Sequence, residues 1–210
     1  MFYRIKVNNQ SIAQRKLLYG VGVNDSWYKT HITINGKDYI CRLHNLWSAM
    51  LERCYCEKTL RRKPDYFNCY VSDEWLVFSN FLKWIESQDI KDKQLDKDIL
   101  ITGNRVYSSA TCLMVPQEIN KLLVIKDKTK GLWPNGVSRV KLTGRFISYC
   151  AVNGKNKGLG TYDTPEEAKL AYDTFKGNHV YSIALKQKDN KLKESLIRIS
   201  SEIKNGTYYK

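Results

Sequence analysis

Residues 136–176 have the clearest alternation of apolar and polar positions in the chain, and they predict three strands followed by a helix. The strand runs are rich in β-branched and aromatic residues and extend over 137–141, 146–152 and 158–162. Gly144 lies in the first turn, and Asn153-Gly154 is a strong hairpin signal for the second. Because three strands bury little surface alone, we expect the helix to cover one face of the sheet.

The start of this helix has a complete capping signature. Thr164 is at the N-cap position, Pro165 follows at the first helical position, and Glu167 completes a capping box. The apolar residues after it recur at helical spacing and predict one buried face. They are Ala168, Ala171, Tyr172 and Phe175.

The rest of the chain alternates between strand and helix patterns. We expect short strands over 19–23 and 31–34, helices over 42–53 and 72–87, and a final amphipathic helix over 185–203. Residues 95–120 read as a strand, a glycine turn and a short helix or loop. The fold class expected is therefore α+β, a mixed N-terminal module (1–125) plus a small three-stranded antiparallel sheet packed on one helix (132–180), with a C-terminal helix (185–204).

Charge narrows the choice of partner. The chain of 210 residues has a formal net charge of +14 and a pI near 9.4, which indicates an acidic partner, most often nucleic acid. A membrane surface is the rival, but no run approaches the roughly 18 apolar residues of a spanning helix, and the N-terminus lacks a signal-peptide pattern. We therefore expect no membrane partner and a cytoplasmic location, in the host cell if a phage encodes the chain.

Basic residues gather around the expected sheet. Between residues 126 and 157 there are eight Lys or Arg and one acid, Asp127, so we expect the free sheet face and its turns to be positive. Ordinary solubilising charges are the alternative. The residues expected to contact DNA are Arg139, Lys141, Arg145, Tyr149, Lys155 and Lys157.

The run LGTYDTPEEAKLAYD, residues 159–173, resembles the ethylene-response-factor (Apetala-type) DNA-binding domain, versions of which also end phage homing endonucleases. This resemblance implies that the sheet lies in the major groove of double-stranded DNA. Ser138, Ala151 and Gly158 stand where plant members have base-reading Arg or Trp. The sheet is therefore expected to contact phosphates more than it reads bases.

Residues 95–120, with the WSAMLERCY and DEWLVFSNFLKWI helices before them, resemble phage HNH (His-Me finger) endonucleases. In that family an Asp-His pair supplies a metal ligand and a general base, and later Asn residues orient the base or bind the metal. The resemblance implies catalytic roles for Asp96, Lys97 and Asn120. Asp96, Asp98 and Asn104 are candidate Mg²⁺ ligands, with Asn120 as a further oxygen donor.

Lys97 replaces the family's His. A lysine of ordinary pKa, near 10.4, is protonated at neutral pH and does not accept a proton, although it can hold a phosphate. The alternative is that the acids are surface residues on an inactive core, and that Asn104 serves a turn.

Cys54, Cys56 and Cys69, with His44 as a fourth residue, are the candidates for structural zinc. Their spacing lacks paired CxxC motifs, so buried thiols are the expected state.

Three functions are consistent with these patterns. The first is a phage-type DNA-binding protein that cleaves DNA with Mg²⁺. The second is the same architecture without catalysis, as a DNA-binding regulator or an antagonist of a host protein. The third is a basic module that binds a protein or RNA.

Overall fold

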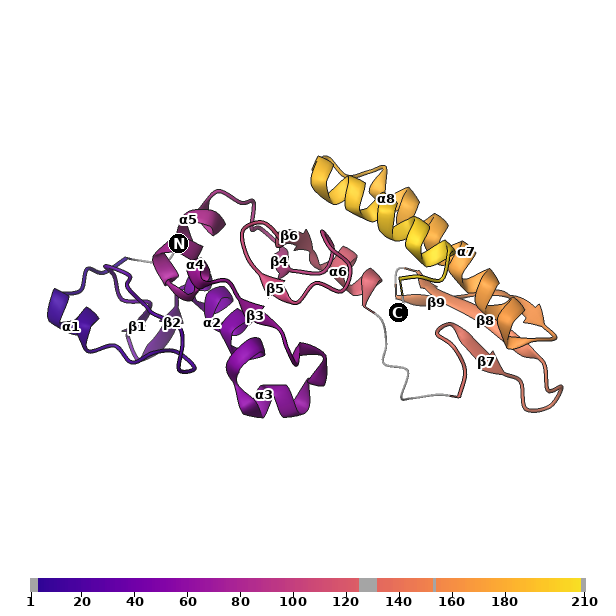
Figure 1. The fold of residues 1–210 in the computed structure, drawn as a ribbon, viewed down its shortest axis with the longest axis horizontal. Helices are drawn as coiled ribbons and strands as arrows, with labels where there is room; N and C mark the ends of the chain where they lie inside the picture. Colours follow the sequence, from indigo (N-terminus) through magenta and orange to yellow (C-terminus); the bar gives the residue numbers. More distant parts are fainter. Residues whose placement is uncertain (1–3, 125–131, 153, 209–210) are drawn as a thin grey trace. The chain divides into compact units, whose positions relative to one another are not determined.

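The computed structural model describes residues 4–124, 132–152 and 154–208, and its contacts divide the chain into two compact units, Met1–Pro116 and Gln117–Lys210 (Figure 1). Helices and small sheets occur in both, so the fold class is α+β as predicted. The boundary predicted near residue 125 lies outside the described residues, as do three of the eight basic residues counted above, Lys126, Lys128 and Lys130.

The first unit contains short helices and three two-stranded sheets. Its elements are α1 (Asn9–Ala13), β1 (His31–Ile34), β2 (Lys37–Ile40), α2 (Arg42–Tyr55), α3 (Glu57–Arg62), the 3-10 turn η1 (Pro64–Tyr66), β3 (Tyr70–Val71), α4 (Asp73–Leu76), α5 (Phe78–Glu86), β4 (Lys93–Asp96), β5 (Val106–Tyr107) and β6 (Leu113–Pro116). Strands β1–β2 and β4–β6 pair antiparallel, and β3–β5 pair parallel.

The β1–β2 hairpin turns at Asn35-Gly36, where both residues have positive φ, 51° and 72°. Two successive positive φ values suit the tight turn that matches strand twist, and Asn and Gly adopt them at low cost. The strand predicted over 19–23 is wrong, because Gly22 and Val23 make only isolated bridges, to Leu18 and Val77.

The helix predicted over 72–87 is two helices, α4 and α5, separated by Val77 in an extended conformation. At this break, backbone groups of the two helices form hydrogen bonds with Val23. Its N–H donates to the Leu76 carbonyl at 2.8 Å, and its carbonyl accepts from the Phe78 N–H at 2.9 Å. A residue far away in sequence thus replaces the helical hydrogen bonds lost at this point.

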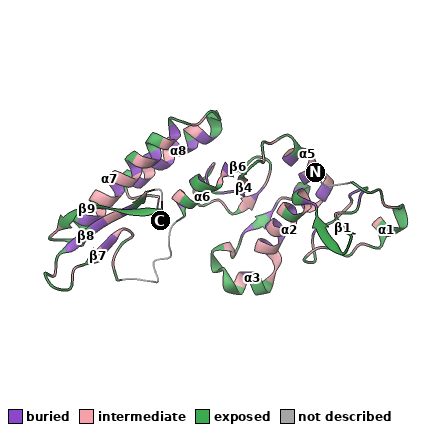
Figure 2. Cartoon of the chain, turned by 180° about the vertical axis from the view of Figure 1, so that it is seen from behind, coloured by how far each residue is buried: buried purple, intermediate pink, exposed green. Residues whose placement is uncertain are grey.

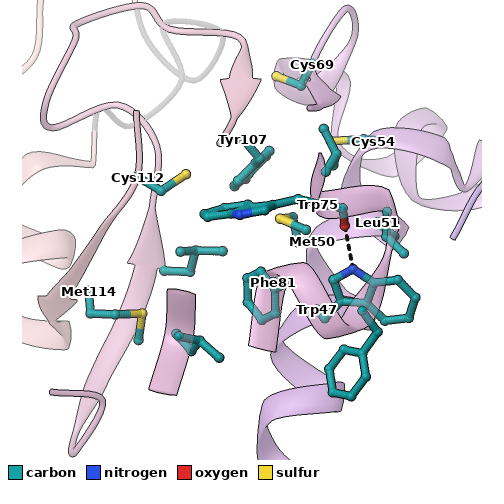
Figure 3. Packing of buried hydrophobic residues seen from close by; sticks show 14 of the residues in the cluster. Trp47, Met50, Leu51, Cys54, Cys69, Trp75, Phe81, Tyr107, Cys112 and Met114 are labelled. Carbon is teal, nitrogen blue, oxygen red and sulfur yellow. Dashed lines mark hydrogen bonds between the residues drawn. The ribbon is translucent and has the colours of Figure 1, made fainter. Parts of the chain in front are cut away.

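Aromatic side chains from α2, α4 and α5 form the core of the first unit (Figure 3). Trp47, Trp75 and Phe81 are fully buried, and the Trp47 indole N–H donates to the Trp75 carbonyl at 2.7 Å. Burial of one such apolar side chain stabilises a fold by about 1.5–3 kcal/mol. The stripe predicted on these helices is therefore core.

The second unit is an antiparallel sheet in the order β7-β8-β9 with α7 against it, as predicted (Figure 1). Its elements are α6 (Gln117–Leu123), β7 (Val137–Arg139), β8 (Phe146–Val152), β9 (Lys155–Tyr162), α7 (Pro165–Ala184) and α8 (Asn190–Lys204). Asn153 of the second turn lies outside the described residues. The capping box is confirmed, since Glu167 N–H donates to Thr164 Oγ1 and Thr164 N–H donates to a Glu167 carboxylate oxygen.

Helix α7 extends to Ala184, beyond the predicted end of its domain at residue 180, and α8 packs along it. The two helices approach closely at Gly177, where an added Cβ would lie 2.9 Å from the Ser200 carbonyl oxygen. Helix α8 starts at Asn190 rather than 185 because the Asp189 side chain caps it, accepting from the Leu192 N–H at 2.9 Å. Its predicted apolar face is buried (Figure 2), through Leu192, Leu196, Ile199 and Ile203.

Candidate functional site

The predicted catalytic segment begins at Asp96, the last residue of β4. One oxygen of its carboxylate, Oδ1, accepts hydrogen bonds from the backbone N–H groups of Asp98 and Ile99, both at 2.8 Å. Burial raises the pKa of Asp96, and the nearby Asp98 carboxylate acts in the same direction, while the two N–H donors oppose the rise. Asp96 thus closes the turn after β4 with its side chain.

Lys97, which replaces the expected histidine, is 6% exposed. Its amine donates to Asp98 Oδ1 at 2.6 Å and to the backbone carbonyl of Asn104 at 2.8 Å, and it lies 5.9 Å from the centre of the Tyr107 ring. A buried ammonium needs such acceptors, because leaving it unpaired costs several kcal/mol. The amine is therefore committed to internal groups and does not face an open cleft.

Asn104 completes the same turn. Its side-chain amide donates to the carbonyls of Lys97 at 2.8 Å and Val106 at 2.7 Å, and its oxygen accepts from the Val106 N–H at 3.1 Å. The side chain is therefore bonded to backbone groups on both of its polar atoms, which is the turn role given above as the alternative to metal binding.

Asn120 lies in α6 and belongs to the second unit, whereas Asp96, Lys97, Asp98 and Asn104 belong to the first. The structure thus brings four of the five predicted residues into one hydrogen-bonded turn. Within the described residues, no group of three or more His, Cys, Asp or Glu is arranged to hold a metal ion.

The zinc candidates are dispersed among different environments. Cys54 and Cys69 are buried beside the aromatic core (Figure 3), whereas Cys56 lies at the start of α3. Burial raises the pKa of Cys54 to about 12, so its thiol stays protonated at neutral pH. His44 packs against Trp47 and Phe78, and burial lowers its pKa to about 4, which keeps the ring neutral.

The two faces of the β7-β8-β9 sheet differ in the residues that they present. Along β8, Phe146, Ser148 and Cys150 are buried, while Ile147 and Ala151 are exposed. Successive side chains on a strand point to opposite faces, so the second set marks the face that α7 leaves free. Residues paired across neighbouring strands share a face, so the register also places uncharged residues there. Ser138 and Thr161 lie opposite Ile147, and Asn156 lies opposite Ala151. The expectation of a positive free face is therefore wrong.

The cations instead gather at the two ends of the strands. Arg139, Lys141 and Arg145 surround the β7–β8 turn, and all three are exposed. Lys155 is exposed at the opposite end, beside the β8–β9 turn. Two of these cations have internal partners: Arg145 pairs with Asp163 at 2.7 Å, and Arg139 donates to the Gly144 carbonyl at 3.2 Å. The expectation of basic turns agrees with this placement.

Two predicted contact residues have a different setting. The Lys157 amine lies 4.9 Å from the centre of the Phe175 ring of α7, and Lys157 pairs with the buried Cys150, so it is directed to the helix side of the sheet. Tyr149 accepts a hydrogen bond from the Ser138 hydroxyl at 3.4 Å and lines a cavity in the second unit. The sequence alone shows a basic and an aromatic residue near the turns and does not indicate these settings.

That cavity, of about 230 Å³, contains a residue that the sequence patterns did not mark, Lys176 of α7. Burial lowers the pKa of Lys176. No local signal distinguishes it from the other lysines of the chain. Its environment depends on elements that are far apart in sequence.

No family model, curated protein or solved structure matches this chain. The two family resemblances therefore stay predictions. Among the described residues, no helix is both long and apolar enough to cross a membrane.

Proposed function

We propose that the chain binds double-stranded DNA through the β7-β8-β9 sheet of its second unit. The observation that carries the proposal is the charge of this element. Residues Val137 to Tyr162 include five Lys or Arg and no Asp or Glu. A surface of this composition attracts the phosphate backbone and releases its counterions.

The distribution of the cations supports a sheet lying in a groove. Strand β8 has seven residues, so its ends are roughly 20 Å apart at ~3.3 Å per residue. This length exceeds the width of the major groove, ~12 Å. Cations at both ends of the strands are therefore placed for phosphates on opposite sides of the groove, and the uncharged face between them is left for the bases.

We further propose that the Asp96–Asn104 turn is structural and that the chain binds DNA without cutting it. Carboxylate and amide oxygens are ligands that Mg²⁺ prefers, but both polar atoms of Asn104 are bonded to backbone groups and Asp96 caps the turn. Lys97 donates two hydrogen bonds where the HNH chemistry requires a proton acceptor. The donors present thus do not fit an Mg²⁺ site, which favours a DNA-binding regulator over a nuclease.

Binding across a salt series tests the first proposal. If the four cations at the ends of the strands, Arg139, Lys141, Arg145 and Lys155, contact phosphates, the logarithm of the affinity for duplex DNA falls against the logarithm of the salt concentration with a slope of about −3.6. A flat salt dependence would contradict the proposal and favour a protein partner. Tighter binding to an RNA duplex of the same length would indicate RNA as the partner.

Plasmid nicking tests the second proposal. We expect no nicking with Mg²⁺ or Mn²⁺ by the purified chain. Nicking that is lost in Asp96→Ala but retained in Asp92→Ala, an exposed aspartate before β4, would show that the site is catalytic.

A further inference from the structure

The cavity that contains Lys176 lies at the edge of β8 that β7 does not cover. Strand β7 pairs with β8 only as far as Ser148, and the Tyr149 N–H then bonds to the Gly136 carbonyl at 2.8 Å. Beyond this point, among the described residues, the edge of β8 faces the cavity rather than another strand. The end of α6 and Tyr208 border it, joined by a hydrogen bond from the Tyr208 hydroxyl to the Leu123 carbonyl.

The lining combines three kinds of group. Among the described residues that line it, Lys121 and Lys176 are the charged ones. The rings of three tyrosines and two asparagine amides add flat apolar surfaces and hydrogen-bonding groups. These residues are Tyr149, Tyr172, Tyr208, Asn135 and Asn156.

Lys176 has no counter-charge in the part of the chain that the structure describes. Its amine makes no ion pair or hydrogen bond with another described residue, and burial lowers its pKa. Even a half-buried ammonium without a partner is destabilising, since its desolvation is not offset by a nearby anion. An anionic ligand in the cavity would supply this missing charge.

We propose that the cavity binds a single nucleotide, with its phosphate at Lys176 and Lys121 and its base against the tyrosine rings. Stacking of one base on an aromatic side chain contributes about 1–3 kcal/mol and tolerates any base. Asparagine amides can bond the edges of a base, because they offer both a donor and an acceptor. The volume of about 230 Å³ is below the roughly 300–1,000 Å³ of pockets for drug-sized ligands, so the cavity suits one nucleotide unit rather than two.

This inference uses none of the cations proposed to contact duplex DNA, although Ala151 and Asn156 of the free sheet face also line the cavity. Arg139, Lys141, Arg145 and Lys155 do not line the cavity. The chain can therefore bind a nucleotide whether or not its sheet binds duplex DNA.

Calorimetric titration of the full chain with deoxyadenosine 5′-monophosphate tests the proposal. We expect saturable binding at one site, and at least tenfold weaker binding of deoxyadenosine or inorganic phosphate alone. Lys176→Met, which keeps most of the length of the side chain and removes its charge, should weaken nucleotide binding at least tenfold. Lys191→Met removes an exposed lysine of α8 outside the cavity and should leave the affinity unchanged.

Absence of saturable binding would overturn the proposal, as would equal affinity for inorganic phosphate or equal affinities of the two methionine variants. A second variant, Ala151→Phe, adds a ring at the exposed edge of the cavity and should block binding if Lys176→Met does not fold. Competition with a short 5′-phosphorylated single strand distinguishes two sources of the nucleotide. Displacement indicates a strand end, and its failure indicates a free mononucleotide.

Discussion

Lysines in the first and second units carry the same formal charge but differ in exposure: one is buried, and others lie at the surface. Lys97 is 6% exposed and held by Asp98 and the Asn104 carbonyl, whereas Lys141 and Lys155 are exposed beside the turns of the sheet. A charge committed to internal acceptors adds nothing to the field that an incoming polyanion meets at close range. Lys97 therefore counts toward the net charge without presenting a cation to a partner, whereas Lys141 and Lys155 present theirs at the surface.

Charge reversal at one end of the sheet is the strongest test of this contrast. Replacing Arg139, Lys141 and Arg145 with Glu should lower duplex affinity about 1,000-fold, or ~4 kcal/mol, because attraction becomes repulsion at three positions. Fluorescence anisotropy with a labelled duplex measures the change, and circular dichroism checks the fold. The same reversal at Lys186, Lys188 and Lys191, exposed around the α7–α8 connection, is the matched control. Equal losses in both variants would mean that net charge, not the sheet, determines binding.

Substitution of the buried lysine should act on stability and leave binding unchanged. Lys97→Met leaves the Asn104 carbonyl without its amine donor and Asp98 without its ion partner, so we expect a loss of about 2–3 kcal/mol in the free energy of unfolding. Urea unfolding followed by tryptophan fluorescence measures it. Lys91→Met, at an exposed position just before β4, should change the stability by less than about 0.5 kcal/mol. Full stability of Lys97→Met would show that the amine is not structural.

The packing of α8 on α7, the helix that covers the sheet, can also be tested by substitution. Gly177→Ala places a methyl group 2.9 Å from the Ser200 carbonyl oxygen, and overpacking of this kind costs about 1–3 kcal/mol. Gly158→Ala, in β9, meets no atom within 4 Å and should be tolerated. Thermal unfolding compares the two variants. If both melt as the parent does, the helices do not pack as closely as described.

The smallest effect is expected at Asp96. Asp96→Asn keeps an oxygen that can accept from Asp98 and Ile99, so stability at pH 7 should stay within about 1 kcal/mol of the parent. Asp96→Ala loses both bonds and should be clearly less stable. Because burial raises the pKa of folded Asp96 above its unfolded value, the folded state binds more protons between these two values.

As pH rises from about 3.9 to the raised pKa of folded Asp96, the free energy of unfolding of the parent should therefore fall relative to that of Asp96→Asn. Urea midpoints of both proteins, measured from pH 3 to pH 7, follow the difference. A parent that gains on the variant with rising pH would contradict the proposed burial of the carboxylate.

Local signals in the sequence predicted the second unit well. Thr164 and Glu167 form their capping box, and the sheet and the face of α8 follow from alternation and helical spacing. Each of these features is formed by residues within a few positions of one another, so the local sequence is enough to predict it. Asp189 is a cap of the same kind, and it is the local signal in the sequence that marks the start of α8.

Features that depend on distant partners were not predictable. The break at Val77 requires Val23, and the setting of Lys97 requires the Asn104 carbonyl and Tyr107. The charge of the free sheet face was mispredicted for a different reason, since a cluster of basic residues in sequence does not say on which side of its strand each one lies. Register assigns them, because Cys150 opposite Lys157 directs that lysine toward α7.

The close packing of α7 on α8 determines where the second unit can be divided for laboratory work. A fragment ending at residue 180 would cut α7 before Ala184 and remove α8, so the buried surface around Val180 and Gly177 would meet water. Apolar helix surfaces exposed in this way favour self-association. A fragment intended for crystallisation or spectroscopy should therefore start at Gln117 and keep Tyr208, whose hydroxyl bonds to Leu123.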